Sequence, residues 1–226
     1  MTGLSHAVSV TSAGASPLDL LMVLFGLSLI PLLAVAATSF TRIIVVLGLV
    51  RASLGTPGLP PNSVIAALAI MLSVVIMSPT LTRIRVEVIA PYAQHRITTS
   101  TALQRGSDVL KRFMLRQTRA ADIRVFERYA RGGSAGGAED QDVRRNPPLS
   151  VVAPAFMVSE LRAAFAMGFA FALPFAAIDI VVAAVMMSLG MFMVSPTTIA
   201  LPLKLLLFIA SDGWSVVCGA LIQSFR

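Results

Sequence analysis

Long uncharged stretches alternate with one charge-rich segment along the chain. Uncharged runs cover residues 20–41, 52–82, 163–178 and 180–203, which are 22, 31, 16 and 24 residues long. A membrane-spanning helix needs about 20 predominantly apolar residues, so three of these runs are long enough by themselves. The pattern predicts an all-α, integral membrane-type protein.

Turn-forming residues divide the apolar runs into two long helical hairpins. Residues 55–62 are rich in glycine and proline, which break helices, and predict a turn between helices over 18–50 and 63–81. Ser195-Pro196 predicts a second turn, between helices at about 158–190 and 197–222. The predicted organisation is a polar N-terminal segment (1–17), a first hairpin (18–81), a polar middle (82–157) and a second hairpin (158–226).

The polar middle is basic and partly helical. It contains most of the charge, because 20 of the 29 charged residues lie within residues 82–154. Apolar residues recur mostly every three or four positions from Leu103 to Ala130, which predicts an amphipathic helix, continuous or broken once, after an N-cap at Ser100. Its apolar stripe is expected to pack on its own domain, with a membrane-surface or subunit-contact role as the alternative. The glycine-rich run that opens residues 132–146 predicts a flexible linker.

The positions of the basic residues predict the orientation. The first 41 residues contain no Lys or Arg, whereas Arg42 and Arg51 lie near the first turn. The positive-inside rule therefore places that turn in the cytoplasm and residues 82–157 in the periplasm. The rule tolerates a basic periplasmic segment of this length, because loops above about 60 residues translocate largely regardless of charge. A cleaved signal peptide is disfavoured, since a basic n-region is missing, although cleavage stays open.

Composition argues against several classes of function. The net charge of +7 and the pI of 11.0 suggest nucleic acid, but the basic segment lies between membrane-like stretches, so no nucleic-acid partner is expected. His6 and His95 are the only histidines and Cys218 is the only cysteine. They leave almost no ligands for a metal site, and the sequence has no glycine-rich phosphate motif. We therefore expect no metal, no cofactor and no enzymatic activity.

Five charged residues lie within or beside the apolar runs, where a charge at a helix centre costs about 2.5–3.5 kcal/mol. They are Arg42, Glu160, Asp179, Lys204 and Asp212. For Arg42 and Asp212 the alternative is a position at a helix end, from which the side chain extends to the membrane–water interface. Lys204 requires a carboxylate, either Asp179 or Glu160 of a neighbouring protomer.

A direct pair between Asp179 and Lys204 in one chain faces a geometric difficulty. In a straight hairpin that turns near Val194-Ser195, they would lie about 23 and 14 Å from the turn. Kinks at Pro174 and Pro202, or a partner on another subunit, would remove the mismatch.

The second predicted turn is rich in sulfur. Met186, Met187, Met191 and Met193 are four of the eleven methionines and fall within eight residues. Flexible thioethers fill irregular gaps and adapt to variable contacts. Ordinary lipid-facing or core packing is one interpretation, and a soft constriction in a pore, formed together with Phe192, is the other.

Several motifs, in order along the chain, resemble the FliP family of flagellar export-gate proteins, whose injectisome relatives are called SctR. The matching segments are residues 38–44, 54–57, 60–62, 77–79, 113–119, 159–161, 190–196 and 212–214. Together they cover the chain from about residue 18 to residue 225. The segments after Thr41 and around Phe113 are more similar to the flagellar branch.

This resemblance implies a core channel-forming subunit of the flagellar export gate in the bacterial inner membrane, at the flagellar basal body. It implies a homo-pentamer that joins FliQ-like and FliR-like subunits, acts with FlhB-like and FlhA-like components, and passes unfolded export substrates. The family's methionine-rich gasket, which closes the pore, corresponds to Met191, Phe192 and Met193. Phe192 keeps the seal hydrophobic but makes it stiffer than methionine would. The family assembly lies at or above the membrane, so helices that look transmembrane can also be buried in protein.

Three alternatives remain open. One is an SctR-type injectisome component. Another is a membrane solute transporter, with a midplane site built by helix breaks at Pro174 and Pro202 and by Asp179 and Lys204. The last is an intramembrane hydrolase, which would need a dyad of Ser195 and Lys204 and is disfavoured because Ser195 precedes a proline in a turn.

Overall fold

The computed structural model describes residues 18, 20, 21, 24, 25, 28, 35–56, 58–130 and 147–225. These residues are predominantly helical and include no strand, which confirms the all-α, membrane-type class. The chain divides into two units, Met1–Ala36 and Ala37–Arg226. The described residues of the first unit are helical, and the elements below all belong to the second. The predicted linker at 132–146 lies outside the described residues.

The first turn forms where glycine and proline predict it. Helix α3 (Phe40–Leu54) is capped at its C-terminal end by Gly55, and helix α4 (Asn62–Ile84) follows. Gly55 has φ +73°, a left-handed conformation that glycine adopts without steric cost, and its N–H donates to the carbonyl of Ala52. Arg51 crosses the turn and donates to the carbonyl of Pro60 and to Oδ1 of Asn62, at 3.1 and 2.6 Å.

The prediction of one helix over residues 18–50 is wrong. Residues 37–39 are not helical, and α3 begins only at Phe40. The hydroxyl of Thr38 accepts a hydrogen bond from the N–H of Phe40, and the hydroxyl of Ser39 bonds that of Ser73 on α4 at 3.0 Å. Short hydroxyl side chains compete for backbone groups in this way and interrupt a helix whose hydrophobicity continues.

The first hairpin also extends further than predicted. Helix α4 does not end at Leu81 but passes into the π-helix η1 (Arg85–Ile89) and then α5 (Ala90–Ala93). The whole segment Asn62–Ala93 contains 32 residues, and Pro79 lies inside it without ending it. Arginine and glutamate are good helix formers, so the onset of charge at residue 83 changes the surface of the helix and not its course.

The amphipathic element of the middle segment is broken once. It consists of α6 (Thr99–Gln117) and α7 (Ala120–Ala130). The N-cap is Thr98 rather than Ser100, since the hydroxyl of Thr98 accepts from the N–H of Thr101. The apolar stripe of α6 is buried within the chain at Val109, Phe113 and Met114, whereas Leu103, with which the predicted stripe begins, is exposed. The ring of Phe113 meets that of Phe156 edge to face at 5.9 Å.

The second hairpin begins earlier than predicted and returns in two pieces. Helix α9 (Leu149–Ser188) has 40 residues and passes through Pro154 and Pro174. The return consists of α10 (Pro196–Ala210) and α11 (Gly213–Gln223), which are bent by 62°, so a single helix over 197–222 is wrong. Asp212 has φ +49° at the bend, and a Cβ on Gly213 would lie 2.2 Å from the ring of Phe208. The tight contact with Phe208 requires glycine.

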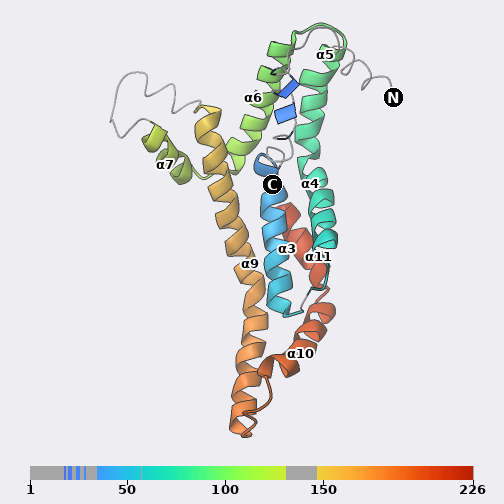
Figure 1. Cartoon of the computed structure of the whole chain (residues 1–226), viewed down its shortest axis with the longest axis vertical. Helices are drawn as coiled ribbons and strands as arrows, with labels where there is room; N and C mark the ends of the chain where they lie inside the picture. The colour runs from blue at the N-terminus through green and yellow to red at the C-terminus, as the bar shows by residue number, and fades with distance from the viewer. Residues whose placement is uncertain are drawn as a thin grey trace. The chain divides into compact units, whose positions relative to one another are not determined.

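Helix α3 is the centre of the second unit (Figure 1). It packs on α9 and α4, and its residues Ile43, Val46, Leu47 and Val50 are fully buried. Figure 1 places the α9–α10 turn at one end of this unit and the α5–α6 turn at the other. By length and composition, Asn62–Ala93 and Leu149–Ser188 can each cross a membrane, and α10 with α11 can form a third span.

Candidate functional site

The deepest ion pair joins α3 to α9. Arg42 donates from Nε to Oε2 of Glu160 at 2.8 Å and from Nη2 to Oε1 at 2.6 Å. The side chains are 6% and 0% exposed. Parallel bonds between a guanidinium and a carboxylate are strong and fix the orientation of both groups. Arg42 is therefore buried, and the alternative of a side chain extending to the interface is wrong for this residue.

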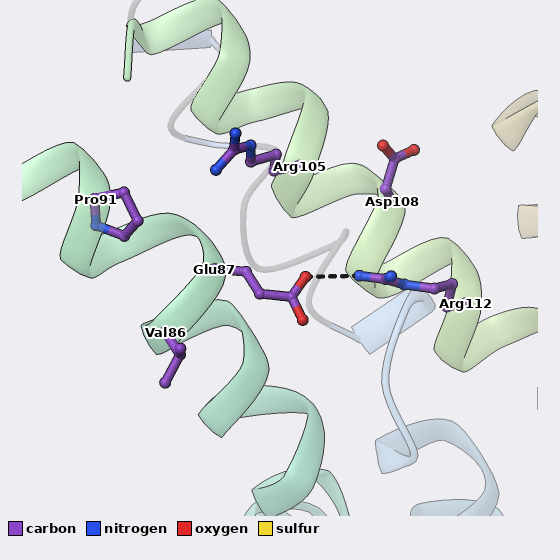
Figure 2. Close-up of a pocket in the computed structure, with 6 residues that line it drawn as sticks. All are labelled: Val86, Glu87, Pro91, Arg105, Asp108 and Arg112. Carbon is purple, nitrogen blue, oxygen red and sulfur yellow. Dashed lines mark hydrogen bonds and ion pairs between the residues drawn. The ribbon is translucent and has the colours of Figure 1, made fainter. Parts of the chain in front are cut away.

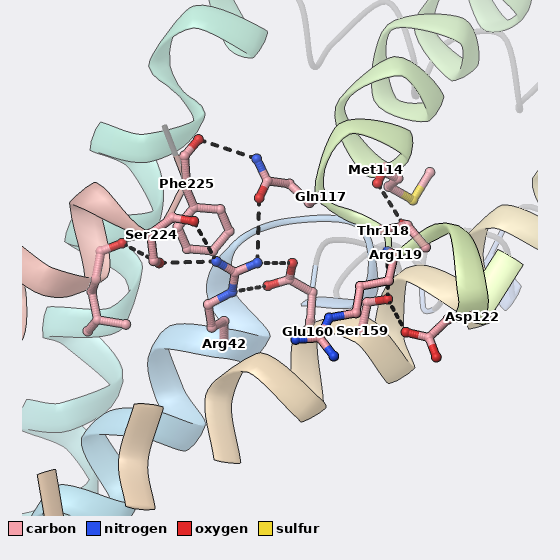
Figure 3. Close-up of polar contacts among 11 residues, drawn as sticks. Arg42, Met114, Gln117, Thr118, Arg119, Asp122, Ser159, Glu160, Ser224 and Phe225 are labelled. Atoms are coloured by element: carbon pink, nitrogen blue, oxygen red, sulfur yellow. Dashed lines mark hydrogen bonds and ion pairs between the residues drawn. The ribbon is translucent and has the colours of Figure 1, made fainter. Parts of the chain in front are cut away.

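The guanidinium of Arg42 also reaches two other elements (Figure 3). Its Nη1 donates to the carbonyl and the hydroxyl of Ser224, at 3.0 and 3.1 Å, and its Nη2 to Oε1 of Gln117 at 3.5 Å. The ring of Phe225 lies against it, with the centroid 3.8 Å from Cζ, a cation–π contact. One side chain thus ties together α3, α6, α9 and the end of α11.

A smaller polar cluster beside this site holds α7 on α9. The hydroxyl of Ser159 donates to Oδ2 of Asp122 at 2.6 Å and accepts from the N–H of Arg119 at 3.1 Å. Arg162 completes the cluster with a contact of 3.3 Å to the other oxygen of Asp122. Asp122 was not among the candidates, because an acid in the first turn of an amphipathic helix is typical of a solvated position. Its burial follows only from the packing of α7.

The second ion pair joins α9 to α10. Nζ of Lys204 lies 2.6 Å from Oδ2 of Asp179 and donates to the carbonyl of Ser53 at 3.2 Å, near the end of α3. The Lys204 side chain is 8% exposed and that of Asp179 is 41% exposed. Oδ1 of Asp179 is buried and accepts no hydrogen bond from the described residues.

The pair forms within one chain because the turn is longer than the sequence pattern suggests. Residues 189–195 separate the two helices, so Asp179 lies nine residues before the end of α9 and Lys204 eight residues after the start of α10. At 1.5 Å per residue, the two positions are about 14 and 12 Å from the turn. The predicted mismatch came from placing the turn at Val194-Ser195. Neither Pro174 nor Pro202 interrupts its helix.

The remaining charged candidate, Asp212, joins neither pair. It is exposed at the α10–α11 bend, and its side chain makes no capping hydrogen bond. Glu160, the other candidate partner of Lys204, contacts Arg42 of its own chain instead.

The sulfur-rich turn lies at the free end of the second hairpin. Gly190 opens it with φ +74°, and the N–H of Met191 donates to the carbonyl of Met186. Phe192 is 79% exposed and Met193 98% exposed. These apolar side chains therefore bury little surface within the chain.

The groups required by a hydrolase do not assemble. Ser195 contacts the hydroxyl of Thr197 at 2.7 Å, whereas Lys204 is held by Asp179 and Ser53. The described part of the chain also contains no group of three His, Cys, Asp or Glu residues that could hold a metal ion.

Known proteins are similar to this chain over most of its length. The model of the FliP family matches residues 23–221. The chain belongs to the FliP family. The flagellar biosynthetic protein FliP of Pectobacterium carotovorum is 45% identical over 91% of this chain and 77% of its own length. FliP of Bacillus subtilis is 39% identical over 93% of both chains. FliP of Buchnera aphidicola from Acyrthosiphon pisum is 42% identical, and the match spans 54% of that longer protein.

FliP membership confirms the resemblance that the motifs indicate, including the preference for the flagellar branch over the injectisome branch. The motif around residues 38–44 contributes Arg42, and the motif at 159–161 contributes both Ser159 and Glu160. The two motifs meet in the Arg42–Glu160 pair. The motif at 190–196 forms the exposed methionine turn.

Proposed function

We propose that the chain is a channel-forming subunit of the flagellar protein export gate, with Met191, Phe192 and Met193 closing the pore. Membership in the FliP family makes the chain a membrane component of the flagellar export apparatus. The observation that supports the pore role is the exposure of the methionine turn at the end of α9 and α10. A single chain leaves this apolar tip uncovered, whereas several copies around an axis would cover one another's tips.

Exposed apolar side chains beside the turn support assembly into a ring. On both sides of the methionine turn, α9 and α10 expose large apolar residues, which are Leu173, Ile180, Val181, Leu203, Leu206 and Ile209. Exposed apolar surface of this extent marks contact with protein or lipid. We propose a homo-pentamer with FliQ-like and FliR-like subunits, which acts with FlhA-like and FlhB-like components on unfolded export substrates in the bacterial inner membrane at the flagellar basal body.

The ion pair of Lys204 and Asp179 would set the position of the gasket. Lys204 lies on α10, whose first residue directly follows the methionine turn. The pair neutralises both charges within one chain, and a lysine that is paired in this way needs no carboxylate from a neighbour. The same pairing, with α9 unbroken at Pro174, argues against a transporter site at this level.

Replacement of the gasket tests the pore role. The triple change Met191→Ala, Phe192→Ala and Met193→Ala removes the apolar bulk, so the assembled complex should conduct ions in a planar bilayer. The matched control truncates three exposed apolar residues on α4, with Met71→Ala, Val74→Ala and Val75→Ala, and should stay closed. An unchanged conductance of the gasket variant in an intact complex would refute the assignment.

The orientation of residues 82–157 in the periplasm is also a proposal, and it rests on the distribution of basic residues. Tyr129 is 78% exposed on α7 and is suitable for a Tyr129→Cys label, in a background with Cys218→Ser. A membrane-impermeant thiol reagent should label it in intact spheroplasts. Labelling only after lysis would invert the topology.

A further inference from the structure

A charged groove and an apolar cavity lie at different places in the second unit. The groove, between η1–α5 and α6, is crossed by the ion pair of Glu87 and Arg112, at 2.8 Å (Figure 2). These two charges of the groove therefore neutralise each other. The cavity lies at the bend between α10 and α11, where residues of α3 and α9 complete its wall, and its volume is about 250 Å³.

The walls of the cavity favour an apolar, aromatic occupant. Of the ten lining residues only Ser211 has a polar side chain, and its hydroxyl already donates to the carbonyl of Phe208 at 3.2 Å. Phe171 and Phe175 also line the cavity, and aromatic rings attract one another beyond the effect of the area that they bury. An apolar cavity of about 150 Å³ holds a benzene molecule, so this cavity has room for a phenyl ring. It opens to the surface at Val216, which is half exposed.

Helix α9 exposes a long apolar stripe, which includes two phenylalanines. Phe165, Phe169, Leu173, Ile180 and Met187 are each between 52% and 70% exposed. An α-helix turns by about 100° per residue, so all five point within about 40° of the direction of Phe169. The aromatic rings are thus held out on one face of a helix whose opposite side packs in the chain.

The stripe and the cavity lie on opposite halves of α9. Phe171, Pro174 and Phe175 line the cavity and follow Phe169 by two, five and six residues. At about 100° per residue, each points at least about 120° away from Phe169. A surface that projects on one side of a chain and a surface that receives on the other can join copies head to tail, and such heterologous contacts generate rings.

Phe169 is also at a suitable height for a neighbouring cavity. In a ring whose axis runs along α9, every copy keeps the same height. The α9 residues that line the cavity lie about 3–9 Å further along the helix than Phe169, at 1.5 Å per residue. Phe165 is one turn more distant. Leu173 is level with the cavity but carries no ring.

The area of the stripe is sufficient for a stable contact. With about 200 Å² for an aromatic and about 100 Å² for an aliphatic side chain, the exposed part of the stripe amounts to about 400 Å². A standard interface buries about 800 Å² per partner, and somewhat more than half of that area is apolar. The stripe alone therefore supplies nearly the whole apolar area that one side of such an interface needs.

We propose that Phe169 of each copy inserts into the cavity at the α10–α11 bend of the next copy. The inference rests on the proposed ring of copies and specifies which two surfaces of the chain form the contact. The ring of Phe169 packs among Phe171, Phe175 and Phe208 of the neighbour, and the rest of the stripe covers the surface around them.

Mixed cross-linking tests this contact. Full-length chains with two different tags, one Phe169→Cys and the other Val216→Cys, are expressed together in a Cys218→Ser background, and the membranes are mildly oxidised. Disulfides should join the two tags. Ala170→Cys is the matched control for Phe169→Cys, because it is an exposed neighbour on α9 that points about 100° away. It should give few dimers with Val216→Cys.

The outcomes separate this contact from the ring itself. A pentamer in native mass spectrometry without mixed dimers would overturn the contact and leave the proposed function standing, with lipid or a different protein on the stripe. Dimers of Phe169→Cys with itself would overturn the head-to-tail arrangement. A protein that is only monomeric would overturn both proposals.

Truncation and filling provide a second test on the purified full-length protein. Phe169→Ala should weaken the association of copies about thirtyfold, the size of effect expected for an aromatic hot spot. Tyr129→Ala, which truncates an exposed ring on α7, should leave it unchanged. Val216→Trp should fill the cavity from its own chain and dissociate the pentamer without lowering the midpoint of thermal unfolding. A pentamer that persists on dilution in both cavity-contact variants would contradict the proposal.

Discussion

The two buried ion pairs of the second unit differ in how completely they are satisfied. Arg42 and Glu160 are almost fully buried, bind through parallel bonds and gain further contacts from Ser224, Gln117 and Phe225. Lys204 and Asp179 share one direct bond, and the side chain of Asp179 is 41% exposed. The buried Oδ1 of Asp179 accepts no hydrogen bond from the described residues. The first pair therefore fixes the fold of the helices, whereas the second holds α10, next to the methionine turn, less firmly.

The largest effect should come from the first pair. Glu160→Ala leaves the guanidinium of Arg42 buried without its carboxylate, and loss of one partner of a buried pair costs about 3–5 kcal/mol. The midpoint of thermal unfolding in detergent should fall sharply. Glu87→Ala, which removes a partner of Arg112 in an exposed pair, should cost at most about 1 kcal/mol. Similar losses in both variants would contradict the distinction between buried and exposed pairs.

The next effect concerns the bend that attaches α10 to α11. Gly213→Ala would place a Cβ against the ring of Phe208, and such overpacking costs about 1–3 kcal/mol. Gly219→Ala is the matched control on α11, since a Cβ there meets nothing within 4 Å. It should stabilise the protein by about 0.5–1 kcal/mol, because alanine is the better helix former. The order of unfolding temperatures, with Gly219→Ala above wild type and Gly213→Ala below, checks both expectations.

Breaking the second pair should affect function more than stability. Asp179→Ala removes a half-exposed carboxylate, and Lys204 keeps its bond to Ser53, so we expect a loss of roughly 1–2 kcal/mol. Secretion of an export substrate should nevertheless fall, because α10 is released from α9. The exchange Asp179→Lys with Lys204→Asp should recover part of the secretion. Normal secretion by Asp179→Ala would show that the pair does not set the position of the gasket.

The smallest effect should come from Phe192→Met. The ring of Phe192 is 79% exposed, so stability should change by less than about 0.5 kcal/mol. A more flexible side chain should keep the pore closed at rest while easing the passage of substrates. Conductance and secretion rate, measured on the same preparation, test this expectation. A strong ion leak through the Phe192→Met variant would show that the seal depends on the stiffness of the side chain and not only on its hydrophobicity.

Periodicity and turn residues predicted the helical class, the first turn and the amphipathic element well, because each depends on local backbone chemistry. Charge burial predicted that Lys204 needs a carboxylate, and Asp179 is the one it contacts. The break at residues 37–39 was missed, because the hydroxyl contact of Ser39 with Ser73 crosses 34 residues of sequence. The contacts of Arg42 with Ser224 and Phe225 were missed for the same reason.

The most direct measurement of the central claim is cross-linking at the gasket. A single Met193→Cys in a Cys218→Ser background places a thiol on the most exposed residue of the turn. If the turns of neighbouring copies meet around a pore, mild oxidation of the membrane-embedded complex should give covalent dimers. Leu103→Cys, near the start of α6 and so close to the α5–α6 turn at the other end of the second unit, should give none. Absence of dimers at residue 193 in an assembled complex, with efficient dimers at residue 103, would contradict the account.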